Sequence, residues 1–228
     1  MENIVLNNKD ELNNYIRQHR VKSLGFGREG TCFLLDNGKV IKDLYESYYP
    51  DFALQFKDLN IDSFVFAKSG VLINNYINAI FIEYIEGLTL LEKIPNNEDI
   101  LLIGEQLQKL VEDIKKISKL GIIVRDFYLG NVIYNKNGFN IIDTINYLYL
   151  HKGDYIIDNL IEIMNKLYNI LIGEIYSCKE IPSNLLFLGQ NDILENPKDY
   201  LKELKEKIEE IGEQNITTLG DAKKILIK

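Results

Sequence analysis

The hydrophobic pattern of the chain changes about one third of the way along it. Up to about residue 86 the apolar residues form short β-rich runs separated by turns, whereas over residues 97–120 they recur at the three- and four-residue spacing of a helix face. Asn96 or Asn97 can cap this helix, and Gly121 can end it. Strands followed by helices predict an α+β protein with a hinge around Glu83–Gly87.

The β-rich part, residues 1–86, is expected to be a small antiparallel sheet with one helix. Residues 9–19 have the pattern of a short polar helix, and Asp36-Asn37-Gly38 supplies a tight turn, since Asn and Gly tolerate positive φ. A helix over residues 50–59 is expected to pack on the sheet, with Pro50 at its start. The expected strands are Val21–Leu24, Thr31–Leu35, Val40–Asp43, Phe64–Ile73 and Ala79–Tyr84.

The remainder, residues 87–228, is expected to be mainly helical. After the helix at residues 97–120, two short apolar runs, Asn131–Tyr134 and Phe139–Ile142, flank a turn sequence and predict a hairpin. Helices are then expected at Tyr155–Leu171, which ends near Gly173, and at the strongly charged Pro197–Ile211.

Composition excludes several classes of protein. With 46% hydrophobic residues in a chain of 228, a core can be buried and disorder is excluded. A net charge of −8 argues against a nucleic-acid partner, because affinity for a polyanion comes from Lys and Arg. The two cysteines, Cys32 and Cys178, form no disulfide or zinc pattern, which fits a reducing cytoplasm. No apolar stretch has the length of a membrane span, so no membrane partner is expected.

A glycine-rich segment, Gly25-Phe26-Gly27-Arg28-Glu29-Gly30, would let backbone N–H groups approach phosphate oxygens. A dinucleotide-binding fold needs a helix directly after such glycines, but here strands follow. An ordinary glycine-containing hairpin is the alternative. Lys42 stands at the end of the next strand, where its ammonium group could pair with nucleotide phosphates or simply lie on the surface.

A second group of polar residues follows the long helix. Asp126 could accept a proton, and Asn131, five positions later, offers an amide oxygen to a metal ion. Asp143 ends the next apolar run and supplies a carboxylate, the ligand type that Mg²⁺ prefers.

With these residues in this order, from Gly25 to Asp143, the chain resembles the protein-kinase-like superfamily, and has some likeness to aminoglycoside and other small-molecule phosphotransferases. The resemblance implies a bilobal kinase-like fold, with residues 1–86 as the N-lobe and 87–228 as the helical C-lobe. It also implies binding of ATP with Mg²⁺ or Mn²⁺, and transfer of the γ-phosphoryl group to a hydroxyl acceptor, on a protein or a small molecule.

The resemblance also implies a role for each residue. Asp126 would be the catalytic base, Asn131 and Asp143 would hold the metal ions, and Lys42 would hold the α- and β-phosphates. The phosphates would be covered by Gly25, Gly27 and Gly30. Ile82 would stand beside the adenine, whose edge would bond the backbone of Glu83 and Ile85.

The chain departs from the family pattern at several places. Val124 stands where His is usual, Tyr128 replaces a lysine, and Asp143-Thr144-Ile145 replaces Asp-Phe-Gly.

The family pattern pairs the lysine with a glutamate on a helix, and no such glutamate is evident here. Asp51 or Glu46 is expected to pair with Lys42 instead. The interval from Asp143 to the next helix, expected near Asp158, is short for an activation loop. A pseudokinase without turnover and a metabolite phosphotransferase therefore stand as alternatives to an active protein kinase, and the oligomeric state stays open.

Overall fold

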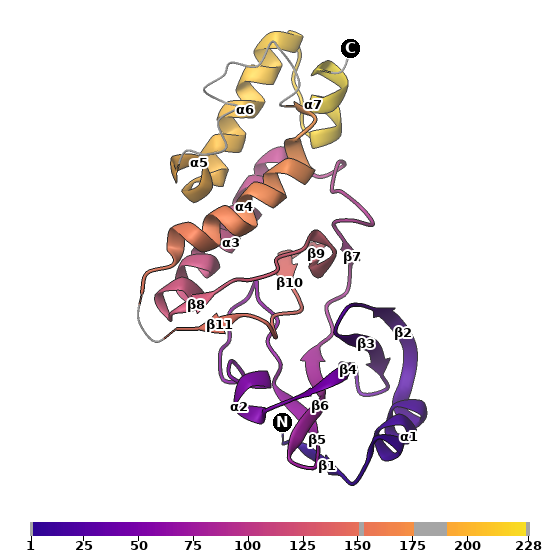
Figure 1. Ribbon diagram of the computed structural model, residues 1–228. Helices are drawn as coiled ribbons and strands as arrows, with labels where there is room; N and C mark the ends of the chain where they lie inside the picture. The colour runs from indigo at the N-terminus through magenta and orange to yellow at the C-terminus, as the bar shows by residue number, and fades with distance from the viewer. Residues whose placement is uncertain (1, 151–152, 176–190, 227–228) are drawn as a thin grey trace. The chain divides into compact units, whose positions relative to one another are not determined.

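The computed structural model describes residues 2–150, 153–175 and 191–226, so Cys178 lies outside the described residues. The chain is α+β and divides into two compact units (Figure 1). Unit 1 comprises Met1–Asn60, Phe64–Glu86 and Ile142–Ile145, and unit 2 comprises Ile61–Ser63, Gly87–Ile141 and Asn146–Lys228. Each unit therefore contains a short segment that is remote in sequence from the rest of it.

Unit 1 is built on a six-stranded sheet in the order β1-β5-β6-β4-β3-β2. All neighbours are antiparallel except β1, which pairs in parallel with β5, so the expected antiparallel sheet is mixed at that edge. Asn74 and Asn75, both at positive φ, form the tight turn between β5 and β6. The strands are β1 Ile4–Leu6, β2 Arg20–Phe26, β3 Gly30–Leu35, β4 Lys39–Tyr48, β5 Ser69–Ile73 and β6 Tyr76–Glu83.

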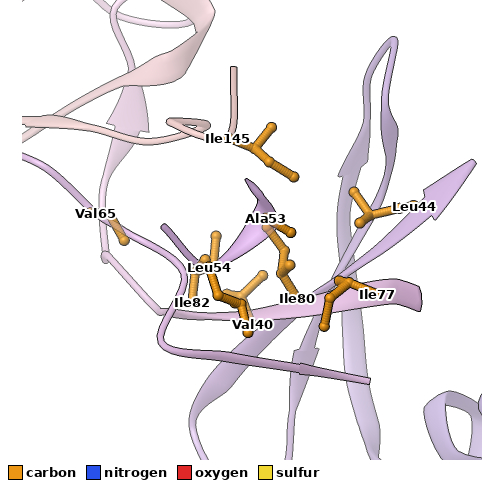
Figure 2. Close-up of a cluster of buried hydrophobic side chains, with 9 residues drawn as sticks. All are labelled: Val40, Leu44, Ala53, Leu54, Val65, Ile77, Ile80, Ile82 and Ile145. Atoms are coloured by element: carbon orange, nitrogen blue, oxygen red, sulfur yellow. The ribbon is translucent and has the colours of Figure 1, made fainter. Parts of the chain in front are cut away.

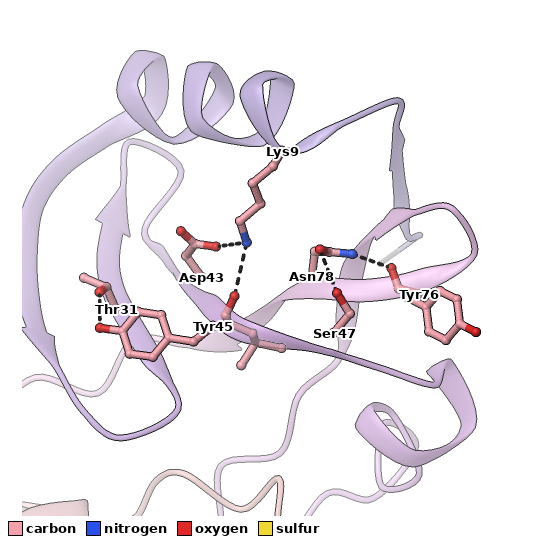
Figure 3. Close-up of polar contacts among 8 residues, drawn as sticks. Lys9, Thr31, Asp43, Tyr45, Ser47, Tyr76 and Asn78 are labelled. Atoms are coloured by element: carbon pink, nitrogen blue, oxygen red, sulfur yellow. Dashed lines mark hydrogen bonds and ion pairs between the residues drawn. The ribbon is translucent and has the colours of Figure 1, made fainter.

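The first helix, α1, spans Lys9–His19 as predicted, and the Asn8 side chain caps it by accepting from the Glu11 N–H. Lys9 ties this helix to the central strand β4, donating to Asp43 Oδ1 at 2.6 Å and to the Leu44 carbonyl at 3.1 Å (Figure 3). Leu12 and Ile16 on the inner face pack with apolar residues of the sheet.

The second helix of unit 1 is much shorter than predicted. Only Pro50–Ala53 is helical (α2). The chain then continues as turns whose hydrogen bonds join residues three positions apart, such as the Lys57 N–H and the Leu54 carbonyl. Of the expected strand at residues 64–73, only Ser69–Ile73 is paired as β5.

A second apolar cluster lies on the other side of the sheet from α1. It joins residues of β4 and β6 to Ala53, Leu54 and Val65, and also to Ile145, which comes from the distant segment Ile142–Ile145 (Figure 2). Burial of Ile145 in this cluster fixes that segment in unit 1.

Unit 2 is mainly helical, as the sequence predicts. The long helix α3, Ile100–Lys119, is capped by the Asp99 side chain rather than by Asn96 or Asn97. At Gly104 a Cβ would lie 3.2 Å from Lys198 Cα, so the glycine permits close contact between α3 and α6. The other helices are α4 Ile156–Ile172, α5 Asn191–Glu195, α6 Pro197–Gly212 and α7 Leu219–Leu226.

Small strand pairs complete unit 2. The predicted hairpin is present as β9, Val132–Asn135, and β10, Gly138–Ile141, and β7, Leu88–Thr89, pairs with β9. A separate pair joins β8, Ile122–Ile123, to β11, Leu148–Tyr149. Among the helices of the described residues, none has both the length and the hydropathy to span a membrane.

Candidate active site

Lys42 is a buried cation in the middle of the unit 1 sheet. It lies on β4, paired with Cys32 of β3 and Ile80 of β6, and only 6% of its side chain is exposed. Its Nζ donates to Glu29 Oε2 at 2.7 Å and to Asp143 Oδ1. A buried ammonium group needs such partners, because removing a charge from water is costly.

These three groups influence one another's protonation. Burial acts most strongly on Lys42 and would lower its pKa, but Asp143 and Glu29 together outweigh it, so that the pKa of Lys42 is raised. Burial also raises the pKa of Glu29, and the neighbouring Asp143 raises it further against the opposing effect of Lys42. One cation thus faces two carboxylates, and the cluster is short of positive charge.

Asp143 reaches Lys42 although the two residues are 101 positions apart. Its backbone is in the left-handed region, at φ 64°, which is uncommon outside glycine and which Asp adopts more readily than most residues. The next two residues anchor it to unit 1, since Thr144 Oγ1 donates to the Val65 carbonyl at 3.0 Å and Ile145 is buried in the cluster of Figure 2.

The carboxylate beside Lys42 is not one of the two that the sequence suggested. Asp51 and Glu46 are both exposed, and no hydrogen bond or ion pair joins either to Lys42 in the described part of the chain. The reason is local, since α2 is a single turn and its first turn carries Asp51 on the solvent side. Glu29, inside the glycine-rich segment, occupies this role instead.

The three glycines of the segment differ in their surroundings. Gly25 has φ 148° and lies at a register shift between β2 and β3, with open space around the position of a Cβ, and Gly27 is equally open. Gly30 is different, because a Cβ there would lie 2.2 Å from the Asp43 carbonyl oxygen. Packing against β4 therefore requires a glycine at this third position, independently of any ligand.

The segment predicted to border a nucleotide base follows β6. Ile82 is buried in the cluster of Figure 2, opposite Val40 of β4. Glu83 is exposed at the end of β6, and Ile85 packs partly against the same cluster. All three residues belong to unit 1.

Asp126 belongs to unit 2 and follows β8. It is exposed and, like Asp143, has a left-handed backbone, with φ 53°. Such conformations cost energy and persist where neighbouring contacts impose them. Here, the residues on both sides of Asp126 are held by α4.

The first of these anchors is Asn159 of α4, which is completely buried. Its Oδ1 accepts from the Val124 N–H at 2.8 Å, while its Nδ2 donates to Ser118 Oγ and to the Ile122 carbonyl, each at 2.8 Å. Asn159 therefore joins α3, β8 and the backbone just before Asp126.

The second anchor is Lys166, which lies seven positions, or about two turns, after Asn159 on α4. Its Nζ donates to the Phe127 carbonyl at 2.7 Å and to Glu162 at 2.6 Å. Because Phe127 itself is buried, the backbone directly after Asp126 is fixed as well.

Asn131 also belongs to unit 2, at the end of a short 3₁₀ helix, Leu129–Asn131, whose last N–H donates to the Tyr128 carbonyl at 2.8 Å. Within the described residues no hydrogen bond joins the side-chain amide of Asn131 to another group. Over the same residues no group of three or more His, Cys, Asp or Glu side chains could hold a metal ion.

Sequence reasoning missed Glu29, Asn159 and Lys166. Only Asn159 had a visible signal, since it is a polar residue on the apolar face of the helix predicted at residues 155–171. The roles of Glu29 and Lys166 depend on contacts over 13 and 39 positions, respectively, which no local pattern shows.

Comparison with known proteins gives one partial relationship. Over 117 residues, half of this chain, the sequence is 33% identical to the "Probable serine/threonine-protein kinase fnkB" of Dictyostelium discoideum. The matched region is 21% of that protein, so the chain spans about a fifth of the length of its relative. No family model matches the chain. The relationship is therefore to a protein named as a kinase, and it covers half of the chain.

Proposed function

We propose that this chain has a bilobal kinase-like fold and is an ATP- and Mg²⁺-dependent kinase that transfers the γ-phosphoryl group to a hydroxyl group. The observation that supports the proposal most is the bond of Lys42, beside the glycine-rich segment, to Asp143, a carboxylate that follows the β9–β10 hairpin. A cation and an oxygen ligand in contact are what binding of a metal-complexed triphosphate requires.

In unit 1, the residues would bind the nucleotide. An ammonium group has three donors, and Lys42 uses two on Glu29 and Asp143, so one N–H remains for a phosphate oxygen. The open space around Gly25 and Gly27 allows phosphate to approach the backbone. The backbone of Glu83 and Ile85 would bond the adenine edge.

The donor groups fit Mg²⁺, which prefers carboxylate and amide oxygens and keeps several waters. Asp143 would hold it in unit 1, beside Lys42, and Asn131 offers an oxygen of the same kind in unit 2. When bound, the metal would neutralise charge on the phosphates. The same cation would relieve the excess of negative charge around Lys42.

In unit 2, Asp126 would act on the acceptor. Its exposed carboxylate would orient the acceptor hydroxyl and take its proton as the oxygen forms a bond to the γ-phosphorus and the bond to the ADP oxygen breaks. The products would be ADP, the phosphorylated acceptor and a proton on Asp126.

The acceptor is proposed to be a protein, as the name of the relative suggests. One observation favours a small molecule instead. Ile156, where α4 begins, is only 13 positions after Asp143, and part of the intervening segment is the strand β11, paired with β8. This leaves little chain for a separate peptide-binding platform.

The test is transfer of labelled phosphate from Mg-ATP by the purified chain to itself, to protein acceptors, and to sugars and aminoglycosides. Asp126→Asn should lower the rate at least a hundredfold, because proton acceptance and positioning of the hydroxyl are lost. Asp158→Asn, a change at an exposed Asp of α4, is the matched control and should leave the rate within about twofold. Equal rates in Asp126→Asn and the unchanged chain would refute the assignment.

A further inference from the structure

The glycine-rich segment carries its own acidic residue, and that residue is turned toward the sheet. Only 15% of the Glu29 side chain is exposed, and its carboxylate lies 2.7 Å from Lys42 Nζ. By contrast, Phe26 in the same segment is 86% exposed. The segment therefore presents its aromatic residue to solvent and its acid to the buried lysine.

Backbone contacts hold Glu29 in this position. Its carbonyl accepts from the Tyr45 N–H at 2.9 Å, and the next residue, Gly30, has no Cβ and so lies directly against Asp43. The Gly27 N–H donates to the Gly30 carbonyl at 2.9 Å and closes the turn. The acid is thus placed by the hairpin itself rather than by a separate helix.

No other described element of unit 1 competes for this role. The single-turn helix α2 contains one acidic residue, Asp51, which is exposed, and Asp43 is engaged by Lys9 at 2.6 Å. Asp143 is the second carboxylate on Lys42, but the proposed function requires it for the metal ion.

We propose that Glu29 is the positioning residue of Lys42, so that the glycine-rich segment and the lysine are held together as one coupled element. This inference rests on the proposed function for its catalytic consequence, but not for the coupling itself. The ion pair orients the ammonium group and holds the segment against β4. A phosphate that reaches Lys42 meets a cation already fixed in direction, so that the bound group is oriented for reaction.

The coupling can be tested without nucleotide, by amide hydrogen exchange of the full chain. The reporters are the Gly27 and Tyr45 N–H groups, which bond to the segment. In Glu29→Ala their exchange should be at least fivefold faster, and Lys42→Met should have the same effect. The double variant should be no faster than either single variant within about twofold, since both changes break one contact.

The matched control for this experiment is Glu46→Ala, which removes an exposed acid from the same strand as Lys42. It should leave both exchange rates unchanged. Wild-type exchange rates in Glu29→Ala, or independent and additive effects of Glu29→Ala and Lys42→Met, would overturn the coupling.

The catalytic consequence is tested by steady-state kinetics with Mg-ATP. Glu29→Gln should lower kcat at least tenfold while changing the KM for ATP less than threefold, and Glu29→Asp, which keeps a carboxylate, should recover part of the loss. Glu46→Gln and Asp51→Asn should keep wild-type kinetics. A wild-type kcat in Glu29→Gln would overturn the positioning role and leave the proposed function intact.

A wild-type chain that neither binds nor turns over ATP would overturn the proposed function instead. In that case the exchange experiment still decides whether Glu29 and Lys42 are coupled, because it uses the protein alone.

Discussion

Replacement of Asn159 by alanine should destabilise unit 2 and loosen the segment that carries Asp126. Asn159 is fully buried and makes three hydrogen bonds, to Val124 N–H, Ser118 Oγ and the Ile122 carbonyl. Alanine would leave a buried donor and a buried acceptor unpaired, each at a cost of about 1–3 kcal/mol. Ser118 would lose less, because its hydroxyl also donates to the Ile114 carbonyl.

The two unpaired groups together should lower the free energy of unfolding by about 4 kcal/mol. About 0.6 kcal/mol of this is regained, because alanine has a higher helix propensity than asparagine. A net loss of about 3 kcal/mol is a large part of the 5–15 kcal/mol that stabilises a typical domain. The measurement is urea unfolding followed by circular dichroism. Because unfolding of two units need not be a single transition, both midpoints should be recorded.

Asn169→Ala is the matched control, since Asn169 is exposed on the same helix and gains the same propensity. It should be neutral or slightly stabilising. Subtracting its effect from that of Asn159→Ala isolates the buried bonds. A difference below about 1 kcal/mol would refute the reasoning, because it would mean that water or a shifted backbone satisfies the exposed groups.

Four further outcomes are expected. Gly30→Ala should cost about 3 kcal/mol in urea unfolding, because its Cβ would lie 2.2 Å from the Asp43 carbonyl, whereas Gly27→Ala, with nothing near, should cost less than about 0.5 kcal/mol. Burial raises the pKa of Cys32 from 9.0 to about 11, and only the thiolate form reacts with thiol reagents. In a Cys178→Ser background, Cys32 of the folded chain should therefore react at pH 8 about 100-fold more slowly than in the unfolded chain. Equal rates would contradict the burial of Cys32. The raised pKa also makes the free energy of unfolding depend on pH: the contribution of Cys32 is fully present below pH 9 and is lost as the pH rises to 11. In Cys32→Ala the free energy of unfolding should therefore fall less steeply between pH 9 and 11 than in the unchanged chain. Lys166→Met should lower kcat by releasing the Phe127 carbonyl while leaving ATP affinity within about twofold, and a wild-type kcat would show that this bond has no catalytic role.

The elements with strong periodicity could be predicted from the sequence. The helices at residues 9–19, 97–120 and 155–171 are confirmed as α1, α3 and α4 within a few residues, because amphipathic patterns over several turns identify them. The hairpin after Asn131 is also confirmed, through its turn sequence.

The prediction failed where tertiary contacts outweigh local pattern. The helix expected over residues 50–59 ends at Ala53, since Leu54 and Phe56 are both buried by turns rather than along one helix face. Parallel pairing of β1 with β5 joins residues that are 67 positions apart, such as Ile4 and Val71, and no local signal reports it.

For the candidate site, the sequence indicated Lys42 and Asp143, and the structure places them in contact. The sequence could not indicate the acid beside Lys42, because Asp51 and Glu46, the acids on or near the expected helix, do not bond this lysine. Glu29 gave no such signal, because in a glycine-rich segment the backbone N–H groups, and not a side chain, are the expected ligands of phosphate.

Assignment of the four residues Ile142–Ile145 to unit 1 has a consequence for how the protein is made. A fragment that stops at Glu86 would keep Glu29 but lack Asp143, the second acid that bonds Lys42, and Ile145, which is buried in the cluster of Figure 2. On the ribosome, this cluster of unit 1 can therefore be completed only after synthesis has passed Ile145. During this interval the apolar surface that Ile145 later covers would be exposed, and exposed apolar surface makes a nascent chain prone to aggregation.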